Sequence, residues 1–168
     1  MKKFFSGKTM FSLLIPAVIL FSFTTVADRV NFSGDWKLDE SKSELGDFGG
    51  RVARSIKVDQ KDIAITITRT TPGFNGGDPV TTTVILTYDG KVTESEGFGG
   101  SKRKSTAVWS DDGSTLTVNN TITFERDGQT SEFKSTETWT MTKEGLLSIV
   151  SHSNSPRGES TTKAIYKK

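Results

Sequence analysis

The stretch Asn31-Phe32-Ser33-Gly34-Asp35-Trp36-Lys37-Leu38, together with the alternating segments C-terminal to it, predicts the fold. Trp36 and Leu38 are two positions apart, so they lie on the same face of an extended strand. From Ser33 onward, apolar and polar residues alternate in short segments bounded by turn residues, and no segment shows a convincing helical period. The pattern therefore predicts one strand after another.

The alternating positions define the predicted buried faces of these strands. The residues that share a face are, in chain order, Val52, Arg54, Ile56 and Val58; Ile63, Ile65 and Ile67; Val84, Leu86 and Tyr88; Arg103, Ser105, Ala107 and Trp109; Leu116, Val118, Asn120, Ile122 and Phe124; Phe133, Ser135, Glu137, Trp139 and Met141. Tight hairpin turns are predicted at Asp89-Gly90, Asp112-Gly113 and Asp127-Gly128. A capping-box pattern, Ser41 with Glu44, predicts a single helical turn.

Strands joined mostly by hairpins form a meander, and we predict an all-β fold, a single antiparallel up-and-down β-barrel of about 8–10 strands. Sequential pairing alone would leave two free strand edges. Pairing of the first strand with the last removes them, which favours the barrel. An open sandwich of two sheets is the alternative.

The N-terminus has the features of a cleavable secretory signal. Three lysines lie before or at the start of an apolar run over residues 10–23, and small residues up to Ala27 suit a signal peptidase. A membrane anchor is the competing interpretation, but the apolar run is short for a span, which needs about 20 residues. We therefore predict a signal peptide over residues 1–27, one domain over residues 28–168, and a secreted or periplasmic location.

The composition excludes several classes of function. The chain has 168 residues and no cysteine, so it has no disulfide, no thiolate nucleophile and no cysteine-bound metal or lipid. Its formal net charge is +2, and loss of residues 1–27, which hold three lysines and no acid, changes it to −1. The charge therefore gives no reason to expect nucleic acid as a partner.

Polar side chains on otherwise apolar faces are the main candidates for a site. A charge buried without a partner is costly, so inward charges are expected to pair or to meet a ligand. Glu137 and Asn120 lie on strands predicted to be adjacent. The proposed ligand-binding set is Trp36, Arg54, Arg69, Arg103, Trp109, Asn120, Glu137 and Trp139. A structural ion pair, or a bulge that turns one of these residues outward, is the alternative explanation.

No catalytic or metal-binding arrangement stands out in the sequence. His152 is the single histidine and has no nucleophile motif around it, so an exposed histidine is the simpler interpretation. With one histidine and no cysteine, we expect no metal site and no cofactor. We expect a protein that is not an enzyme; hydrolysis or isomerisation by Glu137 is the least favoured hypothesis.

The segment 31–38 also resembles the Asn-Phe-x-Gly-x-Trp signature at the first strand of lipocalins. Over residues 32–167 the chain is similar to secreted bacterial lipocalin-like proteins, calycin-like barrels of uncharacterised function. The motifs that carry this likeness are Phe-Ser-Gly-x-Trp-Lys-Leu-Asp from Phe32, Ile-Thr-Ile-x-Arg-Thr at 65–70, Tyr-Asp-Gly-Lys at 88–91, Ser-x-Ala-x-Trp at 105–109 and Thr-x-Thr-Trp-x-Met at 136–141. The resemblance implies a barrel with its ligand inside, and a tryptophan that closes one end. The Arg-x-Tyr pair of fatty-acid-binding proteins is absent at 163–166.

Two functions are compatible with this pattern. The first is a non-enzymatic binding protein that holds a small amphipathic or hydrophobic molecule inside the barrel, between the tryptophans, with Glu137, Asn120 and an arginine orienting its polar end. The second is a structural or interaction module of the cell envelope with a barrel filled by side chains, whose partner meets the glycine-rich loops at 72–79 and 97–100. In both cases we expect a monomer without stable membrane insertion and without a nucleic-acid partner.

Overall fold

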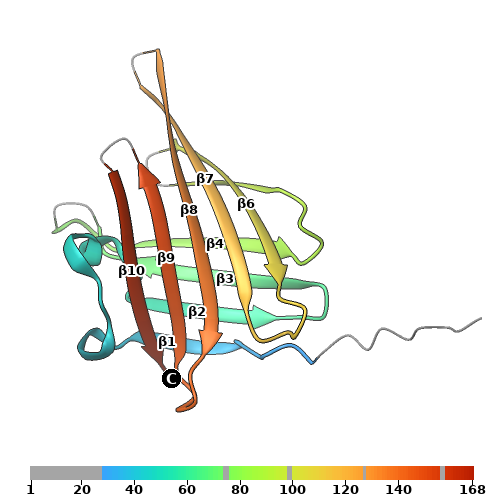
Figure 1. Ribbon diagram of the computed structural model, residues 1–168. Coiled ribbons are helices and arrows are strands. Elements are labelled where there is room, and N and C mark those ends of the chain that lie inside the picture. Colours follow the sequence, from blue (N-terminus) through green and yellow to red (C-terminus); the bar gives the residue numbers. More distant parts are fainter. Residues whose placement is uncertain (1–27, 74–75, 98–99, 127, 156–157) are drawn as a thin grey trace, which may run out of the picture.

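The computed structural model describes residues 28–73, 76–97, 100–126, 128–155 and 158–168, which contain one curved sheet of ten strands (Figure 1). The strands are β1 (Gly34–Leu38), β2 (Ser55–Gln60), β3 (Ala64–Thr71), β4 (Val80–Thr87), β5 (Thr93–Glu96), β6 (Lys102–Trp109), β7 (Leu116–Arg126), β8 (Gln129–Met141), β9 (Leu147–Ser155) and β10 (Gly158–Lys167). The predicted signal peptide, residues 1–27, lies outside the described residues. In the described part of the chain, no helix is long and apolar enough to cross a membrane.

The ten strands form an antiparallel, up-and-down, nearly closed barrel. Their order in the sheet is β4-β3-β2-β1-β10-β9-β8-β7-β6-β5, so consecutive strands lie side by side except at β4 and β5, and β1 also pairs with β10. Leu38 of β1 lies opposite Tyr166 of β10. Figure 1 shows β1 to β4 crossing behind β6 to β10, so that the sheet folds over itself around a core. The predicted all-β up-and-down barrel is confirmed.

The ladder is interrupted at one place, between β4 and β5, which are the two ends of the sheet. Asp89 does turn the chain: its Oδ1 accepts hydrogen bonds from the Thr87 hydroxyl (2.6 Å) and the Lys91 amide (3.2 Å). However, β5 begins only at Thr93 and pairs with β6 alone. The predicted tight hairpin is therefore wrong, because the connection is longer than the two residues such a turn uses and the strands that leave it diverge. We call this interruption the β4–β5 gap.

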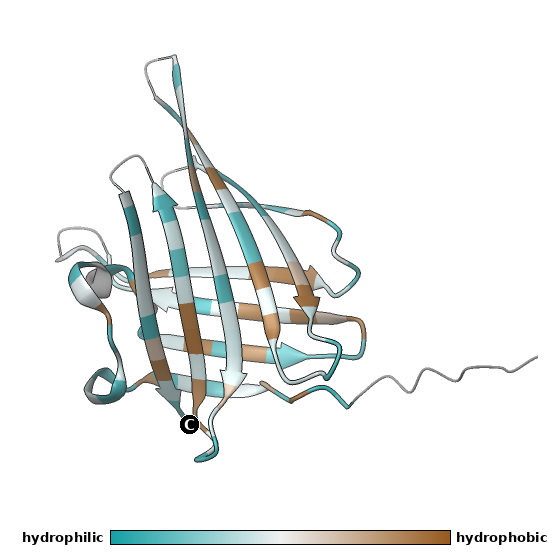
Figure 2. Cartoon of the chain, in the orientation of Figure 1, coloured by the Kyte–Doolittle hydropathy of each residue, from teal (hydrophilic) through white to brown (hydrophobic). Residues whose placement is uncertain are grey.

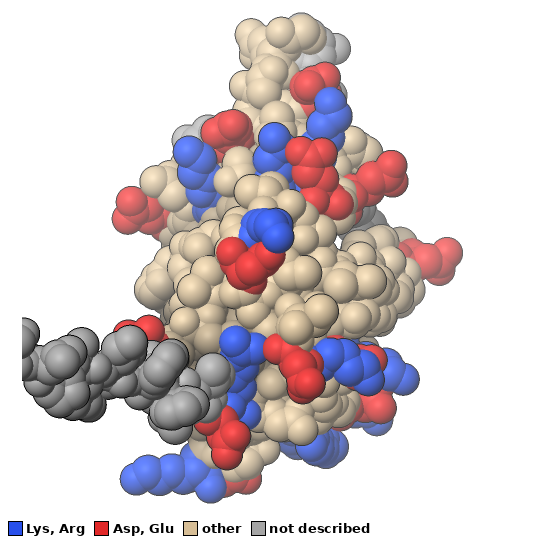
Figure 3. Space-filling model, turned by 90° about the vertical axis from the view of Figure 1, so that its right-hand side faces the viewer, with Lys and Arg blue, Asp and Glu red and all other residues tan. Residues whose placement is uncertain are grey.

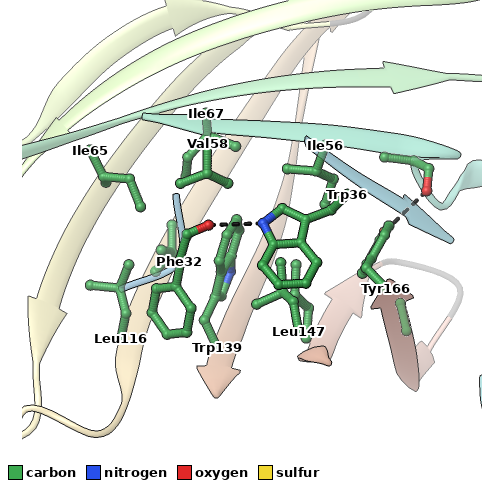
Figure 4. Close-up of a cluster of buried hydrophobic side chains, with 14 of the residues drawn as sticks. Phe32, Trp36, Ile56, Val58, Ile65, Ile67, Leu116, Trp139, Leu147 and Tyr166 are labelled. Atoms are coloured by element: carbon green, nitrogen blue, oxygen red, sulfur yellow. Dashed lines mark hydrogen bonds between the residues drawn. The ribbon is translucent and has the colours of Figure 1, made fainter. Parts of the chain in front are cut away.

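Large apolar side chains fill one end of the barrel, which we call the apolar end (Figure 4). Its members, none of them more than 1% exposed, are Phe32, Trp36, Ile65, Leu116, Trp139 and Leu147. The Phe32 carbonyl accepts a hydrogen bond of 2.8 Å from the Trp36 indole N–H. In Figure 2 the largest brown patches of β6, β7 and β9 lie in the lower half of these strands, which is the same end. Burial of each side chain stabilises the fold by about 1.5–3 kcal/mol.

The segment before β1 closes the apolar end. The side-chain amide of Gln60 holds this segment in place, because it donates to the Val30 carbonyl (2.9 Å) and accepts from the Phe32 amide (2.9 Å). The Arg29 guanidinium lies 4.7 Å from the centre of the Tyr88 ring. The described residues before β1 therefore lie across this end of the barrel.

One of the three isoleucines predicted to share a buried face is in fact exposed. Ile65 and Ile67 are 0% and 1% exposed, whereas Ile63 is 77% exposed. β3 begins at Ala64, and Ile63 lies in the turn from β2, where its carbonyl accepts a hydrogen bond of 3.1 Å from the Tyr88 amide. Alternation holds only within a strand, so the prediction for Ile63 is wrong.

Two short 3₁₀ helices, η1 (Glu40–Lys42) and η2 (Gly46–Arg51), connect β1 to β2. The chain here lies against β10: the Ile165 amide donates to the Ser43 hydroxyl (2.9 Å), and the Ile165 carbonyl accepts from the Asp39 amide (2.7 Å). This contact buries Ile165, which alternation places on the outer face. A helical turn is present, but the predicted capping box is wrong: Ser41 lies inside η1, whose N-cap is Asp39, and Glu44 forms an isolated bridge to β10.

Candidate functional site

Polar side chains predicted to face inward come together in the middle of the barrel. We call this group the charged layer, and its members are Arg69, Arg103, Ser105, Asn120 and Glu137. They come from β3, β6, β7 and β8. Glu137 and Asn120 are 8% and 9% exposed, so both lie in the interior. Alternation along each strand is what places them there, next to the apolar end.

A bidentate ion pair joins the two layers of the barrel across this interior. The Arg69 guanidinium donates to both oxygens of Glu137, at 2.9 and 2.5 Å. The side chains are 20% and 10% exposed. The Trp139 indole N–H also donates to Glu137 Oε2 (2.9 Å), and the guanidinium lies 5.4 Å from the centre of the Trp139 ring. Three donors therefore occupy the two carboxylate oxygens.

The charge of Arg69 decides the ionisation of Glu137. Burial by itself would raise the pKa of Glu137, but attraction to Arg69 and the hydrogen bonds from Arg69 and Trp139 outweigh burial, so the pKa lies below its ordinary value. Burial likewise opposes the charge on Arg69, but attraction to Glu137 raises the pKa of Arg69 overall. Both partners are charged at neutral pH, so Glu137 holds no proton that it could donate as a general acid.

The second arginine of the layer has a different environment. Burial and repulsion from Arg69 lower the pKa of Arg103, and attraction to Glu137 offsets them only in part. The Nε atoms of Arg69 and Arg103 are buried and have no hydrogen-bond partner among the described residues. A guanidinium stays protonated under all ordinary conditions, so Arg103 is a partly buried cation.

Asn120 and Ser105 form a neutral, buried pair on neighbouring strands. The Ser105 hydroxyl donates to Asn120 Oδ1 at 2.7 Å. Ser105 is 1% exposed. Ser105 was not among the predicted site residues, although it shares the predicted face of Arg103; serine is too common on strands for its position alone to single it out.

A small cavity lies beside the charged layer and the β4–β5 gap. It measures about 20 Å³ and is lined by residues of β3 to β7, among them Ile67, Arg69, Ser95, Arg103, Val118 and Asn120. A water molecule needs roughly 10–15 Å³ measured in this way, so the cavity has room for about one water. The interior around the arginines is therefore largely filled by side chains.

The three tryptophans do not surround a hollow interior. Trp36 lies within the apolar end, and Trp109 stacks on the Phe32 ring with 5.5 Å between ring centres. Trp139 lies at the boundary, since it contacts Phe32 edge-on at 6.0 Å and also binds Glu137. Of the tryptophans in the predicted set, Trp139 alone hydrogen-bonds to the charged layer. Phe32, which is at the centre of these contacts, was missed as an organising residue.

Arg54 is not part of the site. Its side chain is 42% exposed and pairs with Glu40 outside the barrel. β2 begins at Ser55, so Arg54 precedes the strand and alternation does not apply to it. The prediction that Arg54 faces the interior is wrong for the same reason as that for Ile63.

Other candidate groups have simpler explanations. His152 is exposed, as predicted, and its Nδ1 lies 2.8 Å from the Thr161 hydroxyl. It lines a shallow, polar groove of about 280 Å³ across β8, β9 and β10. Among the described residues, no group of three or more histidine, aspartate or glutamate side chains is arranged to hold a metal ion.

Comparisons with known proteins place the fold. No protein-family model matches the sequence, and no curated protein matches it significantly. The chain is similar to the crystal structure of zebrafish ileal bile acid-binding protein complexed with cholic acid, with a TM-score of 0.50 and 21% sequence identity over 82% of this chain and 98% of that chain. At this identity the likeness shows the fold alone, an up-and-down β-barrel.

Proposed function

We propose that the chain is a secreted or periplasmic, non-enzymatic protein that binds a small hydrophobic or amphipathic molecule inside its barrel. The observation that carries the proposal is the charged layer: a buried ion pair and a second, partly buried arginine, next to the apolar end and beside a cavity and a gap in the sheet. Small-molecule sites typically combine apolar walls with a few convergent polar groups. The similar zebrafish barrel, in complex with cholic acid, supports this class of ligand.

Binding requires the interior to widen. The cavity measures about 20 Å³. Sites for drug-sized molecules measure roughly 300–1,000 Å³. The β4–β5 gap is where the barrel widens most easily, because β4 and β5 share no ladder hydrogen bonds that would have to break.

The test is a titration of intrinsic tryptophan fluorescence against cholate, a long-chain fatty acid and retinol. Trp139 reports on the site, because it touches the charged layer directly. We expect a saturable change with at least one compound, together with a rise in the unfolding temperature, since a ligand that binds only the folded state stabilises it. No change with any of them up to millimolar concentration would reject the proposal.

Export is part of the same proposal and has its own test. Its support is the basic and apolar sequence of residues 1–27. Expression in a Gram-negative host, followed by mass spectrometry of the periplasmic fraction, is expected to give a mature chain that begins at Asp28. A full-length chain retained in the cytoplasm would contradict export and would have no bearing on the proposed ligand binding.

A second candidate is an interaction module with a filled barrel. The small cavity favours it, and so do four exposed aliphatic side chains, Ile63, Ile85, Val92 and Val108. Figure 3 shows the side of the molecule turned toward the right in Figure 1: charges gather above and below a mostly uncharged band. The glycine-rich loops predicted to form the contact, 72–79 and 97–100, lie partly outside the described residues.

The two candidates can be separated by one substitution. Val92→Asp replaces one of the exposed aliphatic side chains by a charge and leaves the interior unchanged. If the chain is an interaction module, the parent protein should capture a partner from envelope extracts, and this variant should not. If the chain is a binding protein, the variant should give the same fluorescence titrations as the parent.

A further inference from the structure

We propose that the barrel interior binds a monoanionic group, and that Arg103 is the residue that receives it. This inference rests on the proposed function, because the anion is taken to be the polar end of the molecule bound inside the barrel. It assigns different roles to the two arginines of the charged layer. Arg69 is a positioning residue held by Glu137, and Arg103 contacts the ligand.

The charge of the layer is not balanced. It contains two guanidinium groups, Arg69 and Arg103, and one carboxylate, Glu137, so its net charge is +1. Both oxygens of that carboxylate are taken by Arg69, and one of them also accepts from Trp139. Little acceptor capacity is left for Arg103.

No described residue forms a hydrogen bond or an ion pair with Arg103, and its Nε is buried. The Nε of Arg69, which lines the same cavity, is also buried and has no partner among the described residues. Both Nε atoms can only donate. Buried donors without acceptors are costly, so their presence in one place points to a missing acceptor.

The remaining charged and titratable groups around the cavity do not supply that acceptor. Glu96 lines the cavity, but it is exposed and lies on the opposite face of β5 from Ser95. Burial raises the pKa of Tyr166 to about 12, so this phenol near Arg69 is neutral. The excess positive charge is therefore still present where the cavity meets Arg103.

The ligand class can be inferred from this arrangement. A guanidinium offers parallel N–H donors that match a carboxylate or a sulfonate, and a net charge of +1 suits an anion with one charge. Ile67 and Val118 line the same cavity and lie toward the apolar end. We therefore expect a molecule with a single anionic group and an apolar body.

Two fluorescent probes with nearly the same aromatic frame provide the test. 1-Anilinonaphthalene-8-sulfonate carries one sulfonate, and N-phenyl-1-naphthylamine carries no charge. We expect the sulfonate to bind the parent protein more tightly, at one site by calorimetry. Arg103→Gln should weaken the sulfonate by roughly 30-fold or more, the scale for loss of a desolvated charge pair. It should leave the uncharged probe nearly unchanged.

Two control variants and a stability measurement separate binding from folding. Arg103→Lys keeps the charge and should lose less affinity than Arg103→Gln. Lys102→Gln removes a charge from the exposed neighbouring position and should change neither probe. Without probe, Arg103→Gln should unfold at a higher temperature, because it removes a partly buried charge that has no partner among the described residues.

The outcomes are distinct. If both probes bind equally and Arg103→Gln changes neither, the anion site is rejected and the proposed function stands. If Arg103→Gln lowers the unfolding temperature, Arg103 serves the fold and the inference is rejected as well. If neither probe binds any variant, this inference is rejected, and the proposed function is rejected with it only if the titrations with cholate, fatty acid and retinol also show no change.

Discussion

The apolar end and the charged layer are adjacent parts of the same barrel interior, yet they are built on opposite principles. The apolar end consists of large side chains that are at most 1% exposed, and the Trp36 indole within it has its hydrogen-bond partner. The charged layer holds an ion pair, a second cation and buried donors without acceptors. The side chains of the apolar end stabilise the fold, whereas the unpaired cation and donors of the charged layer lower its stability. Polar groups that a fold buries at such a cost mark the region where a ligand is expected.

Removal of an anchor from the apolar end should have the largest effect. Trp36→Ala leaves a cavity and an unpaired Phe32 carbonyl, so we expect the free energy of unfolding to fall by about 3–5 kcal/mol. Trp36→Phe keeps most of the volume and should cost about 1 kcal/mol, mainly through the lost hydrogen bond. Denaturant unfolding of both variants measures this. A loss below about 1.5 kcal/mol for the alanine variant would show that the end is not close-packed.

Breaking the ion pair should cost somewhat less. Glu137→Gln leaves the Arg69 charge buried without a partner, and we expect a loss of about 3 kcal/mol, the low end for buried pairs, because Arg69 retains some exposure. Glu94→Gln is the matched control, because its pair with Lys104 (3.3 Å) is exposed. This control should change stability by less than about 0.5 kcal/mol.

A double variant tests whether the pair stabilises the fold or only avoids a penalty. Arg69→Met combined with Glu137→Leu replaces both charges by apolar groups of similar size. Such replacements are often neutral or stabilising, so the double variant should regain most of what Glu137→Gln loses. If it is as unstable as the single variant, the charged layer contributes to stability in the same way as the apolar end, and the contrast between the regions disappears.

Lowering the pH should reduce the contribution of the charged layer to the free energy of unfolding, and it should not change the contribution of the apolar end. The pKa of Glu137 is lower in the folded chain than its ordinary value of 4.5. Its contribution to stability is therefore complete above pH 4.5 and is lost as the pH falls through the folded-state pKa. The difference in unfolding free energy between the parent and Glu137→Gln should shrink with falling pH. Asp112, whose pKa is about 2, is present in both proteins and cancels. A difference independent of pH would contradict the assignment.

The sequence was sufficient for the strands because the information for them is local. Alternation of apolar and polar residues and Asp-Gly turns act over a few neighbours, and they predicted the inward faces of β6, β7 and β8 correctly. The β4–β5 gap was not predictable in this way. Whether two strands stay paired after the turn at Asp89 depends on the curvature of the whole barrel, which no short segment encodes.

In the site, too, the local features were predictable and the contacts between distant residues were not. Parity alone predicted that Arg69, Arg103 and Glu137 face inward. Which arginine pairs with Glu137 was not predictable, because Arg69 lies 68 positions away in the sequence and reaches Glu137 only when β3 folds over opposite β8. The cavity volume depends on how all the surrounding side chains pack, so the sequence could not distinguish a hollow barrel from a filled one.

The smallest expected change in the free energy of unfolding is that of Ile63, which alternation wrongly predicted to be buried. Ile63 and Ile65 are the same residue type, two positions apart, and 77% and 0% exposed. Ile65→Ala should cost about 2–5 kcal/mol, whereas Ile63→Ala should change the free energy of unfolding by less than about 0.5 kcal/mol. Chemical denaturation of the two variants measures the difference. A loss above about 1 kcal/mol for Ile63→Ala would mean that the β2–β3 turn belongs to the apolar end. The prediction that Ile63 shares the buried face of Ile65 would then be correct.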